Sequence, residues 1–299
     1  MSEGYIALAM DDSRYMDLAA NLALSIRRLD TRPISVIVNK AIHIKPEYRA
    51  LFDSIIEAPD EPDIRGAMNK ARLYHYTPYE RTMYVDTDCI LFSHRVEFFW
   101  RKLSGQAFII EGLRQTTGPV FGCSLGVKDA ATIRARMNVP YVIVCNTGVL
   151  YFERNPQAEQ VFNRVLALYR SPERDHISYP FKHEGEYNDE PFFGVVLPAM
   201  GIAPLDSPLT HRLQVTTPNM VDGVFDLDIG NVQVLKQAAG QAAQVWSGVI
   251  CHFCGLAPMD TYFDLADKLR REAGFPIMDR SQFQPVVLHA PQPMASSAS

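Results

Sequence analysis

Two aspartates separated by one residue stand where an apolar stretch of the chain ends. Residues 83–85 are apolar and lead into Asp86, Thr87 and Asp88, and the chain is apolar again over residues 89–92. Because side chains two positions apart in an extended segment point the same way, both carboxylates can reach one ion while Thr87 faces away. Hard oxygen ligands suit Mn²⁺ or Mg²⁺, which act as Lewis acids on phosphate oxygens.

The simpler interpretation of this sequence is a solvated turn, because Asp is common in turns. A structural turn does not require two charges to be carried into a crowded, apolar sheet edge, where their burial costs free energy. The context therefore predicts a metal or phosphate site at Asp86 and Asp88. A second pair with the same spacing, Asp226 and Asp228, precedes the alternating residues 231–236 and is predicted to be the tight turn of a hairpin.

The elements before the acidic pair alternate between strand-like and helix-like patterns. Strands are expected at residues 5–10, 34–38, 55–56 and 83–85, and helices at residues 16–29 and 67–76. This alternation is typical of a parallel sheet covered on both faces. Such sheets bind ligands beyond the C-terminal ends of their strands. Asp86 lies at such an end, so the α/β pattern agrees with a ligand site there.

The pattern is less regular beyond residue 93. Strands are expected at residues 107–110, 141–145 and 148–152, and a helix is expected after Asn155 with Pro156 at its first position. The small, polar residues 286–299 are expected to be disordered.

Composition excludes several classes of protein. The chain has 299 residues, of which 47% are hydrophobic and 21% charged, as in ordinary globular proteins. A net charge of −5 without a dense basic cluster argues against nucleic acid as the main partner. No transmembrane segment or basic signal region is expected, and five scattered cysteines fit reduced thiols. A cytoplasmic location is therefore predicted.

The run from Lys70 through Arg81 to Asp86, Thr87 and Asp88 resembles the GT-A glycosyltransferases, and family 8 in particular, to which glycogenin and the bacterial lipopolysaccharide galactosyltransferases belong. The likeness extends from residue 5 to about residue 258. It implies a Rossmann-like mixed sheet with helices on both faces, in a single domain over residues 1–285. Within it, residues 1–92 would bind the nucleotide-sugar and residues 93–285 the acceptor.

The resemblance also implies an activity and a set of site residues. The activity is transfer of a hexose from a nucleotide-sugar, typically a UDP-sugar, to a carbohydrate or other hydroxyl acceptor with retention. The cofactor would be Mn²⁺ or Mg²⁺. The residues matching the family's base-binding loop and phosphate-binding positions are Ala9, Met10, Asp11, Asp12, Tyr15, Lys70 and Thr87.

Three later segments match the family's sugar, catalytic and metal positions. The segment 145–149 resembles its Asn-Ser-Gly stretch, which places Asn146 at the sugar, and Asp189 and Glu190 match its acidic segment beside the reacting carbon. The stretch 252–255 resembles its His-Phe-x-Gly motif, which makes His252 the third metal ligand beside the aspartates and places Gly255 at the donor. Where the family continues to a Lys that contacts the diphosphate, this chain reads Leu256-Ala257-Pro258, which leaves one phosphate counter-charge unassigned.

Each of these segments also has a purely structural interpretation. His252 lies between apolar neighbours and could be a core histidine with satisfied hydrogen bonds. Residues 146–148 could form an ordinary turn between two strands. Asp189 and Glu190 could cap a helix that begins at Pro191.

Two other functions compete with sugar transfer. Asp86 after an apolar strand also resembles the nucleophile of haloacid-dehalogenase-like phosphatases, in which Asp88 would act as general acid. That family places the loop on its first strand, whereas here some eighty residues of α/β pattern precede it. A non-catalytic sugar- or nucleotide-binding protein is the third class.

Overall fold

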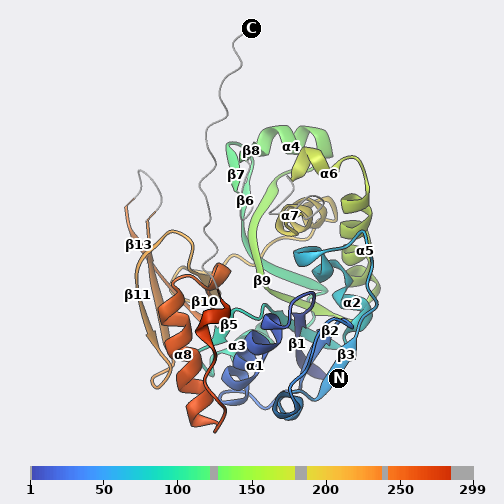
Figure 1. Ribbon diagram of the computed structural model, residues 1–299. Coiled ribbons are helices and arrows are strands. Elements are labelled where there is room, and N and C mark those ends of the chain that lie inside the picture. The colour runs from blue at the N-terminus through green and yellow to red at the C-terminus, as the bar shows by residue number, and fades with distance from the viewer. Residues whose placement is uncertain (1, 122–126, 179–186, 238–241, 284–299) are drawn as a thin grey trace.

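The computed structural model describes residues 2–121, 127–178, 187–237 and 242–283, and its centre is a six-stranded mixed sheet (Figure 1). The strand order is β3-β2-β1-β4-β9-β6. Strands β1 to β4 run parallel, whereas β9 runs antiparallel to both β4 and β6. The bounds are Glu3–Ala9 (β1), Ile34–Val38 (β2), Ser54–Glu57 (β3), Arg81–Val85 (β4), Phe108–Gln115 (β6) and Val142–Glu153 (β9).

The central sheet is buried on both faces because its strands carry apolar side chains on both. In β1, Tyr5, Ala7 and Ala9 pack into one hydrophobic core, while Ile6 packs into the other. All five residues of β2 are buried. Near-continuous apolar strands of this kind are what a sheet covered by helices requires.

Each hydrophobic core is closed by its own helices, on opposite sides of the sheet (Figure 1). One core is covered by α1 (Arg14–Arg27), α3 (Val96–Leu103) and α8 (Met259–Glu272), and the other by α5 (Pro156–Arg170) and α7 (Glu190–Ala199). Helix α5 begins as predicted, since the Asn155 side chain accepts a hydrogen bond from the Ala158 N–H and Pro156 takes the first helical position.

The shorter elements complete the chain. They are α2 (Leu73–Tyr76), α4 (Ala130–Met137), α6 (Arg174–Ile177), β7 (Pro119–Phe121), β8 (Val127–Asp129) and the 3₁₀ helices η1 (Pro46–Leu51), η2 (Gly66–Arg72), η3 (Cys254–Leu256) and η4 (Arg280–Gln282). No helix in the described ranges is long and apolar enough to cross a bilayer. The four described cysteines are free thiols, as predicted, and Cys123 lies outside the described residues.

A second sheet of five strands brings the chain's last strand to the acidic pair. It contains β10 (Arg212–Thr216), β13 (Gln244–His252), β12 (Asn231–Lys236) and β11 (Met220–Asp226) in that order, with β5 (Cys89–Leu91) paired to β13. The pairing of β5 with β13 sets His252 opposite Cys89, the residue that follows Asp88. The predicted hairpin turn is confirmed, because Asp226 Oδ1 accepts hydrogen bonds from the N–H groups of Asp228 and Ile229 between β11 and β12.

The structure differs from the sequence-based expectations in three places. The helix expected at residues 67–76 is a 3₁₀ turn followed by the short α2. The two strands expected on either side of residues 146–147 form one strand, β9. Helices α3, α4, α6 and α8 and most of the second sheet were not predicted, and the expected disordered tail, residues 286–299, lies outside the described residues.

Candidate functional site

The loop that carries Asp86 and Asp88 leaves the end of β4 and is fixed by backbone hydrogen bonds to two other strands. The Asp86 N–H donates to the Gly148 carbonyl of β9 at 2.8 Å, and the Phe253 N–H, just after β13, donates to the Asp88 carbonyl at 3.1 Å. Asp86 directly follows β4, so its predicted place at the C-terminal end of a parallel strand is confirmed. The expectation of an extended segment at Asp86 and Asp88 was wrong, because the chain turns there and the Cys89 N–H donates to the Asp86 carbonyl at 3.0 Å.

His252, the last residue of β13 in the second sheet, faces this acidic pair. Its Nε2 lies 3.1 Å from Asp88 Oδ1 and 3.7 Å from Asp86 Oδ2, and its Nδ1 lies 2.7 Å from Asn146 Oδ1. Burial alone would lower the pKa of His252, but the neighbouring Asp88 and Cys254 outweigh it and raise this pKa well above its usual value. His252 is buried, but its ring nitrogens contact polar residues of the predicted site rather than apolar side chains.

The described residues offer a cation two carboxylates and an imidazole. Ligand atoms of Asp88, Cys89 and His252 all lie within 4.8 Å of one another, and Asp86 Oδ2 is 3.7 Å from His252 Nε2. Burial, with the nearby carboxylates, raises the pKa of the fully buried Cys89 thiol well above its usual value, so it stays protonated. Oxygen and imidazole ligands suit Mn²⁺ and Mg²⁺ better than a thiol does. The donor set thus fits a hard divalent cation.

A buried lysine links the acidic pair to the second acidic segment. Lys70 Nζ donates to Asp86 Oδ2 at 2.9 Å and to Thr147 Oγ1 at 3.0 Å, and it lies 3.8 Å from Asp189 Oδ1. The Tyr84 hydroxyl donates to the other Asp86 oxygen. Burial would raise the pKa of Asp86, but Lys70, His252 and Tyr84 together lower it. Asp86 is therefore ionised at neutral pH.

Asp189 and Glu190 stand at the start of α7, close to Lys70. Asp189 is only 1% exposed, its side chain makes no capping hydrogen bond, and its Oδ2 has no hydrogen-bond partner in the described part of the chain. Burial, reinforced by Glu190 and Asp86 and opposed by Lys70, raises the pKa of Asp189 to about 7. A buried carboxylate oxygen without a hydrogen-bond partner is costly, so a capping role does not account for Asp189.

The loop after β1 forms a second polar cluster at the same edge of the sheet. Asp11 has a positive φ of 70°, and the Asn39 amide donates to Asp11 Oδ1 at 2.9 Å and to Asp60 Oδ1 at 2.8 Å. Asn39 was not predicted, although it directly follows β2 and so lies at the end of a parallel strand. Of the predicted base-binding residues, Ala9 and Met10 are buried, Asp12 binds Arg14, and Tyr15 is 46% exposed.

Two further residues shape the site, although the sequence analysis gave neither of them a role. A Cβ on Gly148 would lie 2.2 Å from His252 Nδ1, so only glycine leaves room for the imidazole. The Gln214 amide donates to the Asn146 carbonyl at 2.8 Å. The predicted donor contacts Thr87 and Gly255 lie in the loops next to the metal candidates, where Thr87 is buried and Gly255 has a positive φ of 64°.

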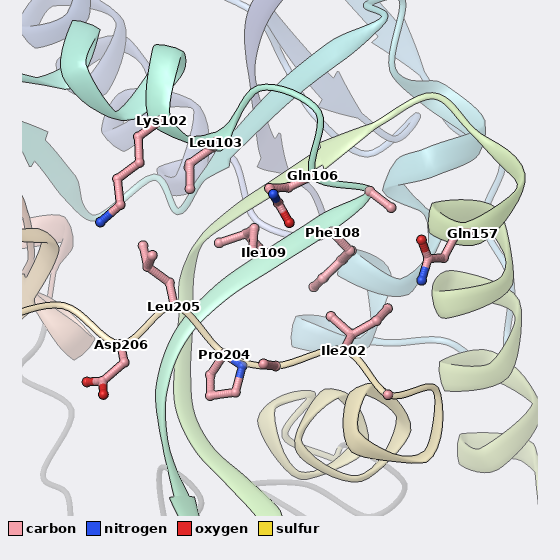
Figure 2. A pocket seen from close by; sticks show the side chains of 13 residues that line it. Lys102, Leu103, Gln106, Phe108, Ile109, Gln157, Ile202, Pro204, Leu205 and Asp206 are labelled. Atoms are coloured by element: carbon pink, nitrogen blue, oxygen red, sulfur yellow. The ribbon is translucent and has the colours of Figure 1, made fainter.

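A cavity of about 420 Å³ lies elsewhere, between the end of α3, the start of β6 and the segment 201–206 (Figure 2). Its lining mixes apolar side chains such as Leu103 and Ile202 with Lys102 and Asp206. None of the predicted site residues lines it. We place the site at the acidic loop instead, because that is where the charged groups converge.

Comparison with known proteins relates the chain to sugar transferases. No protein-family model matches it. Part of the sequence is 30% identical to the glycogenin of Komagataella phaffii; the match covers 30% of this chain and 27% of that protein, so the chain spans little more than a quarter of its relative's length.

Solved structures extend the likeness over most of the chain. The galactosyltransferase LgtC, crystallised with donor and acceptor sugar analogues, superposes with a TM-score of 0.55 at 13% identity, covering 88% of this chain and 95% of LgtC. An active-site mutant of LgtC gives a TM-score of 0.50 at 12% identity, with the same coverage. The predicted GT-A fold and the resemblance to glycosyltransferases of the family 8 type are confirmed.

Proposed function

We propose that this chain of GT-A fold is a glycosyltransferase that moves a hexose from a UDP-sugar to a hydroxyl acceptor with retention. Asp86, Asp88 and His252 would hold Mn²⁺ or Mg²⁺. The observation that carries the proposal is the convergence of this donor set with Lys70 and the buried Asp189, from elements far apart in the sequence. A structural role for these residues would not require so many buried charges in one place.

The proposed chemistry follows from the charges. A bound cation would neutralise the diphosphate that leaves when the sugar bond breaks. Burial alone would lower the pKa of Lys70, but Asp189 and Asp86 outweigh it and raise this pKa. Lys70 therefore stays protonated and would supply a second positive charge at the phosphates. It would partly replace the phosphate contact that the missing C-terminal lysine makes in family 8.

The acidic residues of α7 would act on the sugar. Asp189 or Glu190 would stabilise positive charge that develops at the anomeric carbon, while the departing phosphate oxygen deprotonates the acceptor hydroxyl on the same face. The alternative is that one of them attacks the anomeric carbon and forms a covalent glycosyl-enzyme. Mass spectrometry of the enzyme mixed with donor alone separates the two, because only the second route leaves a hexosyl adduct.

The test of the function is nucleotide release from a panel of nucleotide-sugars, with Mn²⁺ and with chelator. We expect turnover of a UDP-sugar only with metal, and loss of that turnover in Asp88→Asn. Asp228→Asn is the matched control, because it changes the second residue of the other Asp-x-Asp pair, in the hairpin turn. Metal-independent turnover, or equal activity in the two variants, would contradict the proposal.

No observation supports the phosphatase alternative. Asp86 follows the fourth strand of the chain, and the fold matches a galactosyltransferase over most of its length. Mg²⁺-dependent release of phosphate from simple esters, abolished by Asp86→Asn, would revive that alternative.

A further inference from the structure

One amide side chain connects the candidate metal ligand to the candidate catalytic carboxylate. Asn146 Oδ1 accepts from the Gly148 N–H at 3.0 Å and lies 2.7 Å from His252 Nδ1. Asn146 Nδ2 donates to Glu190 Oε1 at 3.0 Å and contacts Cys254 Sγ at 3.8 Å. A primary amide has two acceptor lone pairs and two N–H donors. Among the described residues, these contacts place partners on both the oxygen and the nitrogen of the Asn146 side chain.

The partners also fix which way the amide points. The Gly148 N–H can only donate and the Glu190 carboxylate can only accept, so the oxygen of Asn146 faces Gly148 and its nitrogen faces Glu190. His252 Nδ1 then faces an acceptor and must carry a hydrogen. Nε2 is the imidazole atom directed at Asp88, 3.1 Å away.

The surrounding backbone keeps this arrangement in place. A Cβ on Gly148 would lie 2.2 Å from His252 Nδ1 and 2.8 Å from Asn146 Oδ1. The side-chain amide of Gln214 donates to the backbone carbonyl of Asn146 at 2.8 Å and so links β10 to β9 at this point. Gly148 of β9 therefore leaves the space that the Asn146–His252 hydrogen bond needs.

We propose that Asn146 is a positioning residue that presents His252 Nε2 to the cation and at the same time holds Glu190 in place. This inference rests on the proposed function and deepens it, because it ties the metal half of the site to the sugar half through one side chain. Hydrogen-bond partners of metal-bound histidines commonly change metal affinity by about 10- to 100-fold.

Two substitutions at this position separate its two contacts. Asn146→Asp keeps an acceptor for His252 and Gly148 but loses the donor to Glu190, whereas Asn146→Ala loses both. By electron paramagnetic resonance of Mn²⁺, without donor sugar, we expect the Asp variant to bind Mn²⁺ at least as tightly as the wild type. The Ala variant should bind it about 10- to 100-fold more weakly. The Asp variant should retain its Mn²⁺ affinity while its kcat falls.

A matched control uses the other amide that contacts the same carboxylate. Asn188 Nδ2 donates to Glu190 Oε2 at 3.1 Å, so Asn188→Ala should disturb Glu190 without changing Mn²⁺ affinity. Gly148→Ala should weaken Mn²⁺ binding as Asn146→Ala does. Wild-type affinity in Asn146→Ala, or equal weakening in Asn146→Asp and Asn146→Ala, would overturn the inference.

A metal-free measurement keeps the inference separate from the proposed function. In crystal structures without metal, the His252 imidazole should keep the same orientation in the wild type and in Asn146→Asp, and should turn away from Asp88 in Asn146→Ala. An unchanged imidazole orientation in Asn146→Ala would refute the role of Asn146. If the wild type fails to bind Mn²⁺ but the imidazole turns in Asn146→Ala, the metal proposal fails and the positioning role stands.

Discussion

Replacing Asp189 by Asn tests the electrostatics of the site in the metal-free protein. Asp189 is 1% exposed, one of its oxygens has no hydrogen-bond partner among the described residues, and burial raises its pKa from 3.8 to about 7. An Asn side chain has nearly the same shape and no charge to bury. The variant should therefore be more stable than the wild type wherever the wild-type carboxyl is ionised.

The sign and size of the effect follow from proton binding. Between about pH 4 and about pH 7 the folded state holds a proton on Asp189 that the unfolded chain has released, so the free energy of unfolding falls as pH rises through this window. A difference of roughly three pKa units corresponds to about 4 kcal/mol. This loss of unfolding free energy is absent below about pH 4 and complete somewhat above pH 7. The Asp189→Asn variant has no carboxyl at this position and therefore does not show it.

Urea unfolding of both proteins in chelator, followed by circular dichroism between about pH 5 and pH 8.5, measures the difference. We expect Asp189→Asn to exceed the wild type by up to about 4 kcal/mol at the alkaline end, with the advantage shrinking as pH falls. The same variant should lose transferase activity, since buried unsatisfied charge is often retained for function. A difference in stability that stays constant with pH, whatever its size, would contradict a raised pKa of Asp189 in the folded protein.

Three further substitutions probe the framework of the site. Lys70→Met should lower the free energy of unfolding by about 3–5 kcal/mol, because it leaves the buried Asp189 and the half-buried Asp86 without their cation; denaturant unfolding showing a loss below about 1 kcal/mol would contradict this. Tyr84→Phe removes a hydrogen bond to the same carboxylate and should cost about 1–3 kcal/mol in the same assay, and wild-type stability would count against that bond. Gly194→Ala would place a Cβ 2.4 Å from the Ile143 carbonyl and should cost about 1–3 kcal/mol, so an unchanged melting temperature would contradict the close packing of α7 on β9.

The first half of the fold could be predicted because its signals are local. The apolar run of β1, the β-branched β2 and the Asn155-Pro156 helix start all determine their own structure within a few residues. The placement of Asp86 follows from the same local pattern, since it depends only on where β4 ends.

The rest depends on contacts between residues far apart in sequence. The pairing of β5 with β13 joins Cys89 to His252 across more than 160 residues, and no periodicity in either segment signals it. The sequence of residues 146–147 is also compatible with a turn, because polar side chains are common in turns. In the structure they continue β9, and their polar groups are used by Lys70, His252 and Glu190 instead. We infer that these residues break the local pattern because the proposed site uses their side chains.

We propose that Asp86, Asp88 and His252 hold a cation that binds the diphosphate of the donor. Isothermal titration of UDP into the protein, with Mn²⁺ and with chelator, measures this binding. We expect UDP to bind only with Mn²⁺, and this binding to be lost in Asp88→Asn but not in Asp228→Asn. Equal UDP affinity with and without the metal would show that no cation mediates the binding.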